Sequence, residues 1–87
     1  MIFNSQEAYE RLIVELDRRA IKYIVHRFSS GIKMIDIWYN DLFYVVQIEN
    51  NFAGISLIDE DNGGFDTTPD TKIFTVEDFL LKVRSTF

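Results

Sequence analysis

Two short polar turns, Asn40 with Asp41 and Asn50 with Asn51, constrain the fold of this chain more than any other feature. Each turn separates two runs rich in Ile, Val, Tyr and Phe, a composition typical of strands. Asn and Asp suit two-residue hairpin turns because they tolerate positive φ angles. Since side chains alternate between the faces of a strand, the length of a turn also predicts which side chains share a face.

Both turns assign the same side chains to one face of the predicted sheet. The first turn pairs Tyr39 with Leu42, and the second pairs Ile48 with Ala53. The pairing continues away from each turn, and the middle strand belongs to both hairpins. We therefore predict a core face that carries Ile35, Ile37, Tyr39, Leu42, Tyr44, Val46, Ile48, Ala53, Ile55 and Leu57.

A fourth strand precedes these three, and the sequence leaves its register open. The tripeptide Ser-Ser-Gly at 29–31 separates it from the next strand. A three-residue turn sends Tyr23 and Val25 to the core face, whereas a two-residue turn sends the even-numbered side chains there. We favour the three-residue turn. The predicted sheet is an antiparallel meander, with strands at about 22–28, 32–39, 42–49 and 52–58.

The segment before the sheet predicts a helix at about residues 5–19. Asn4, or its rival Ser5, can cap its start, and Glu7 lies at the capping-box spacing from Asn4. Apolar residues then recur at intervals of three and four, as on one face of a helix. That stripe is Tyr9, Leu12, Ile13, Leu16 and Ala20.

A second helix is predicted after Thr75, which can act as its cap, with Asp78 three residues later. Its apolar stripe is Val76, Phe79, Leu80 and Val83. The whole chain, residues 1–87, therefore reads as a single α+β domain of order αββββα, with both helices packed on one face of the sheet.

Composition and charge restrict the class of protein. With 47% apolar residues and no cysteine, the chain can form a core but no disulfide or thiolate metal site, which favours the reducing cytoplasm. No apolar run approaches the roughly 20 residues of a membrane span, and the start of the chain does not resemble a signal peptide. The net charge of −5 argues against direct nucleic-acid binding, although no carboxylate occurs between Asp17 and Asp36.

The face opposite the core face is too apolar for an ordinary solvent-exposed surface. The predicted register places several large apolar side chains there and pairs Trp38 with Phe43. A helix or the acidic loop could cover this surface, a second copy of the chain could pack on it as a homodimer, or another protein could dock there. The candidate protein-binding residues are Met34, Trp38, Phe43, Val45 and Ile58.

The acidic loop at residues 59–70 contains a second candidate site. Asp59, Asp61, Gly64 and Asp70 match part of the spacing of an EF-hand, but a strand precedes the loop and Gly63 replaces a ligand. We expect an acidic connection, with weak calcium binding as one alternative. An acidic patch that mimics nucleic acid is another alternative, and its residues would be Asp59, Glu60, Asp61 and Asp66.

The residues that usually perform catalysis are scarce. His26 is the sole histidine, and no Gly-rich phosphate loop or cysteine nucleophile is present. We therefore expect neither enzyme activity nor a cofactor. The leading hypothesis is a small protein that acts by binding another protein or itself, as a regulator, an inhibitor or an immunity-type partner.

Overall fold

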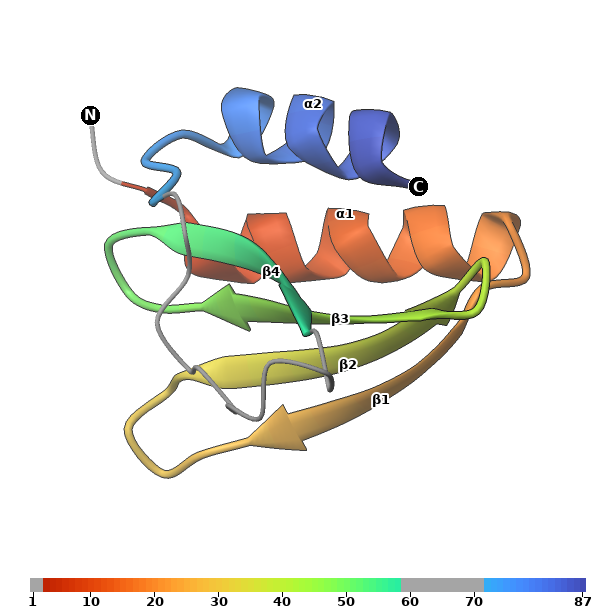
Figure 1. Cartoon of the computed structure of the whole chain (residues 1–87). Coiled ribbons are helices and arrows are strands. Elements are labelled where there is room, and N and C mark those ends of the chain that lie inside the picture. Colours follow the sequence, from red (N-terminus) through yellow and green to blue (C-terminus); the bar gives the residue numbers. More distant parts are fainter. Residues whose placement is uncertain (1–2, 59–71) are drawn as a thin grey trace.

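The computed structural model describes residues 3–58 and 72–87. Four strands form one antiparallel sheet in which neighbours in sequence are also neighbours in the sheet, and one helix precedes the strands along the chain and another follows them, which confirms the predicted α+β meander. Both helices lie side by side on the same side of the sheet (Figure 1). The elements are α1 (Ser5–Arg18), β1 (Lys22–Arg27), β2 (Lys33–Tyr39), β3 (Leu42–Ile48), β4 (Ala53–Ile58) and α2 (Val76–Thr86).

The hairpin turns produce the predicted register. Tyr39 pairs with Leu42, and Asn40 and Asp41 between them have φ angles of 57° and 64°, as a type I′ turn requires. In the next hairpin the Glu49 N–H donates to the Phe52 carbonyl at 2.8 Å. That turn closes without positive φ angles at its two asparagines, so tolerance of positive φ was not the reason for asparagine at that turn.

The first hairpin has the favoured three-residue turn. Tyr23 pairs with Ile37, which places Tyr23 on the core face. The Phe28 N–H donates to the Ile32 carbonyl at 3.0 Å, so residues 29–31 form the loop. Gly31 has a φ of 91°, a left-handed conformation that a residue with a Cβ rarely adopts.

Helix α1 begins and ends with recognisable caps. The Asn4 Oδ1 accepts from the Glu7 N–H at 3.0 Å, which identifies Asn4 rather than Ser5 as the N-cap. At the other end the Ile21 N–H donates to the Leu16 carbonyl at 2.9 Å, and Ala20 has a φ of 56°. This is a Schellman motif. Ala20 is therefore exposed beyond the helix, and the prediction that it belongs to the apolar stripe is wrong.

The core lies between the helices and the predicted sheet face, with two exceptions. Leu42 and Leu57 are 44% and 50% exposed, although their register places them on the core face. Phe87, just after α2, packs edge-on against Tyr39 and Tyr44, with ring centroids 5.7 and 5.0 Å apart. The helical layer leaves both leucines partly uncovered, so the prediction that they are core residues is wrong.

The lead-in to α2 is anchored at the edge of the sheet. Ile73 forms an isolated antiparallel bridge with Ala53, with N–H to carbonyl distances of 2.7 and 2.8 Å. The Thr75 side chain then accepts from the Asp78 N–H at 3.1 Å and caps the helix as predicted. This bridge positions α2 beside α1.

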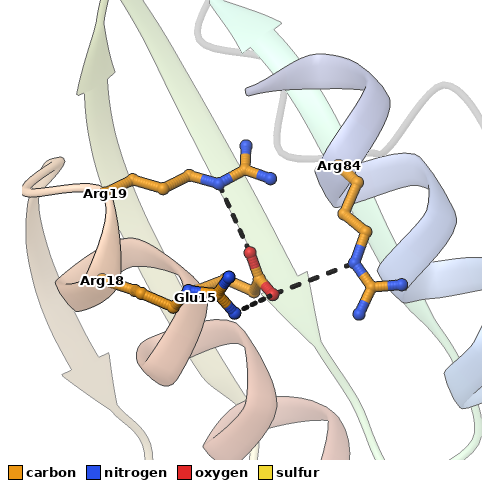
Figure 2. Close-up of polar contacts among 4 residues, drawn as sticks. All are labelled: Glu15, Arg18, Arg19 and Arg84. Atoms are coloured by element: carbon orange, nitrogen blue, oxygen red, sulfur yellow. Dashed lines mark ion pairs between the residues drawn. The ribbon is translucent and has the colours of Figure 1, made fainter.

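A buried carboxylate joins the two helices near their C-terminal ends (Figure 2). The Glu15 carboxylate lies 3.3 Å from the Arg19 Nε, 3.8 Å from the Arg84 Nε and 3.9 Å from an Arg18 Nη. Glu15 and two of the arginines belong to α1 or its cap, whereas Arg84 belongs to α2. Since a buried charge is costly without partners, the three guanidinium groups explain how a glutamate can lie among the buried residues of α1.

Candidate functional site

The face of the sheet opposite the helices is the candidate site, and we call it the outer face. It consists of the even-numbered residues of β1, β2 and β4 and the odd-numbered residues of β3. Both helices of the described residues lie on the other side of the sheet, so neither α1 nor α2 covers the outer face (Figure 1). The five predicted protein-binding residues all belong to this face, as the register of the two hairpins requires.

A stacked aromatic pair lies at one end of the outer face. The Trp38 and Phe43 rings are 5.3 Å apart with an interplanar angle of 24°, and Trp38 is 38% exposed. Phe43 pairs in turn with Ile58 on β4. The Lys22 Nζ lies 5.2 Å from the Trp38 ring centroid, within the range of a cation–π interaction. The tryptophan is thus held between a cation and a second ring, which reduces its freedom before any partner binds.

The other two predicted residues contribute differently. Met34 is half-buried between His26 and Gln47, and its flexible thioether suits an adaptable contact. Val45, in the middle of the face, is only 6% exposed. Val45 therefore offers little area for contact and acts as support for the neighbouring side chains.

A histidine–carboxylate pair lies on the same face. The His26 Nε2 and the Asp36 Oδ2 are 2.8 Å apart, on adjacent strands. The favoured three-residue turn places both residues on the outer face, whereas the alternative two-residue turn would have placed His26 on the core face. A His–Asp pair performs nucleophilic chemistry only when the second ring nitrogen meets a nucleophile. Within the described part of the chain, Asp36 is the hydrogen-bond partner of this imidazole and no nucleophile is bonded to it.

The acidic candidates cannot be placed. Asp59, Glu60, Asp61 and Asp66 lie outside the described residues, so calcium binding and mimicry of nucleic acid remain predictions. In residues 3–58 and 72–87, no group of three or more His, Asp or Glu side chains is arranged to hold a metal ion.

Neither described helix is long and apolar enough to cross a membrane. No protein-family model, curated protein or solved structure matches the chain. The outer face itself is therefore the basis for the proposed function.

Proposed function

We propose that this chain is a small non-enzymatic protein that binds another protein, or a second copy of itself, through the outer face. The observation that carries the proposal is the exposed, stacked Trp38 beside Phe43 on a sheet face that neither of the two described helices covers. Such a protein would act as a regulator, an inhibitor or an immunity-type partner. The cysteine-free composition favours the cytoplasm as its compartment.

The energetics of Trp38 support the role of an anchor. With 38% of its surface exposed, the side chain still presents roughly 90 Å² to solvent. Burial of that area would contribute about 2 kcal/mol, which is the usual size of a hot-spot residue. Trp38 is also pre-oriented by Phe43 and Lys22, so binding would cost less side-chain entropy than for a freely rotating ring.

The part of this face away from the aromatic pair provides polar contacts. His26 and Asp36 form their hydrogen bond on the β1 side, and Gln47 donates to Glu49 at 2.7 Å on the β3 side. The outer face therefore combines an apolar anchor at one end with polar side chains toward the other, and protein–protein interfaces usually combine apolar and polar contacts. The pairing of His26 with Asp36 leaves a half-exposed imidazole that can contact a partner without an unpaired buried charge.

The test compares Trp38→Ala with Leu81→Ala, a matched loss of an exposed apolar side chain on α2. Light scattering over a range of protein concentrations detects a homodimer, and photo-crosslinking from position 38 in cells followed by mass spectrometry identifies another partner. We expect Trp38→Ala to weaken the complex by about tenfold or more and Leu81→Ala to leave it unchanged. An unchanged complex in Trp38→Ala, or a monomer without any crosslinked partner, would reject the proposal.

A further inference from the structure

Strand β1 ends the sheet on one side and offers backbone hydrogen-bonding groups there. Since the Phe28 N–H donates to Ile32, and bonded positions alternate along an antiparallel pair, the even-numbered residues of β1 bond to β2. The N–H and carbonyl groups of Tyr23, Val25 and Arg27 therefore point toward the free edge. In the described part of the chain, no strand pairs with that edge.

The side chains at the centre of β1 allow another strand to pair with this edge, and those at both ends of β1 are basic. Ile24, 48% exposed, and Val25 occupy the centre of the strand, without a proline, a glycine or a charge. Lys22 begins the strand and Arg27 ends it. Natural edge strands are usually protected by charges, prolines or bulges within the strand. Here the centre carries none of these.

The charge around this edge is positive and has few acidic neighbours. In the sequence, no carboxylate occurs between Asp17 and Asp36. Asp17 accepts from the Tyr23 hydroxyl at 2.8 Å, and Asp36 is bonded to His26. Among the described residues, neither Lys22 nor Arg27 forms an ion pair; their cations lie instead over the rings of Trp38 and Tyr9.

This charge selects the occupant of the edge. In a symmetric antiparallel pair of two β1 strands the odd-numbered residues would lie opposite each other, for example Tyr23 opposite Arg27, so a second copy of the strand would bring no carboxylate to either cation. An extended segment with carboxylates at its two ends would instead neutralise both cations. A second copy would thus leave both cations without a carboxylate, whereas an acidic strand would pair with them, so the charge favours an acidic strand.

We propose that the free edge of β1 binds an extended acidic peptide segment of another protein, which adds to the sheet as a strand antiparallel to β1. Lys22 and Arg27 are five residues apart and lie on opposite faces of the sheet. The bound segment therefore carries acidic residues five positions apart, with apolar residues opposite Ile24 and Val25. This site lies beside the outer face but does not depend on it, so the two proposals can fail separately.

The first test uses the purified chain and the capped peptide Glu-Thr-Val-Ile-Thr-Glu, titrated to millimolar concentration with amide hydrogen exchange measured by NMR. The geometry predicts that the amides of Tyr23, Val25 and Arg27 exchange more slowly with peptide, while those of Ile24 and His26 are already protected. Absence of added protection at the three odd-numbered amides would overturn the proposal. Slow exchange of these three amides in the absence of peptide would also overturn the proposal, because the edge would then be occupied already. If that protection rises with protein concentration, the occupant is a second copy of the chain.

The second test examines charge and strand pairing. Lys22→Glu should weaken peptide binding about two- to tenfold, and the same reversal at exposed Lys82 on α2 should leave it unchanged. A peptide with lysines in place of its glutamates, and one with proline opposite Val25, should not bind. Equal binding of the acidic and lysine peptides would refute the role of charge. Trp38→Ala should change peptide affinity less than twofold, which separates this site from the outer face.

Discussion

The ion-pair cluster at Glu15 yields a prediction about how the two helices are held together. The Glu15 side chain is nearly buried, and three guanidinium groups lie within 3.9 Å of its carboxylate oxygens, although the side chains of Arg18 and Arg84 remain largely exposed. Exposed ion pairs contribute about 0.2–1 kcal/mol each, so the cluster should stabilise the fold by about 1–2 kcal/mol. Glu15→Gln keeps the size of the side chain and removes its charge, which leaves three cations close together.

The measurement is urea unfolding followed by circular dichroism in 20 mM and 1 M NaCl. We expect Glu15→Gln to lose about 1–2 kcal/mol at low salt and measurably less at high salt, because salt screens the exposed arginines although it screens a partly buried carboxylate less. The matched control Glu10→Gln removes an exposed carboxylate on the same helix and should cost less than about 0.5 kcal/mol. A loss that is equal in both salts would refute an electrostatic role for the cluster.

A double-mutant cycle isolates the contact between the helices. Glu15 pairs with Arg84 across the helices, whereas Arg18 and Arg19 are neighbours along α1. Glu15→Gln combined with Arg84→Gln should give a coupling energy of about 0.3–1 kcal/mol. Additive losses in the cycle would mean that the pair does not join α1 to α2.

Three further predictions concern packing, backbone and pH. Phe79→Ala, at a fully buried position, should cost about 3–5 kcal/mol of unfolding free energy in urea and leave the chain largely unfolded if its total stability is of similar size. Ala20→Gly should raise that free energy by about 1 kcal/mol, because glycine adopts the left-handed φ of 56° without strain; a loss of stability would contradict the Schellman assignment. The hydrogen bond to Asp17, with burial and the carboxylate charge, raises the pKa of the Tyr23 hydroxyl above its ordinary 10.0. Because the pKa of Tyr23 is higher in the folded than in the unfolded chain, its hydrogen bond contributes fully to the free energy of unfolding below about pH 10, and this contribution is lost as the pH rises through the folded pKa. Tyr23→Phe should therefore flatten the decline of the unfolding free energy at alkaline pH, measured by urea unfolding.

Most of the fold could be predicted because its signals are local. A two-residue turn sets a register, and a register assigns alternate side chains to opposite faces, so Asn40 and Asp41 sufficed to place Trp38 beside Phe43 on the outer face. The caps at Asn4 and Thr75 likewise follow from side chains that bond to amides three residues away. The outer face was therefore assembled correctly from sequence, including the pairing of Phe43 with Ile58.

Other features of the site required the tertiary structure. The cation of Lys22 over Trp38 and the bond between His26 and Asp36 depend on the first strand, whose register two turn lengths could satisfy. How far each side chain is exposed was also beyond the sequence. Val45 and Trp38 share the outer face, yet one is nearly buried and the other is exposed, because burial depends on all neighbouring side chains at once.

The sequence by itself determined the order of elements, the meander and the division of the sheet into two faces, because turn chemistry and the period of apolar residues act over a few neighbouring positions. Only the tertiary structure decided how much of the sheet the helices cover and which charged side chains form ion pairs. It left Leu42 and Leu57 partly exposed at the margin of the core face. It also brought Arg84 to the Glu15 carboxylate, a contact between residues on different helices that depends on how those helices pack.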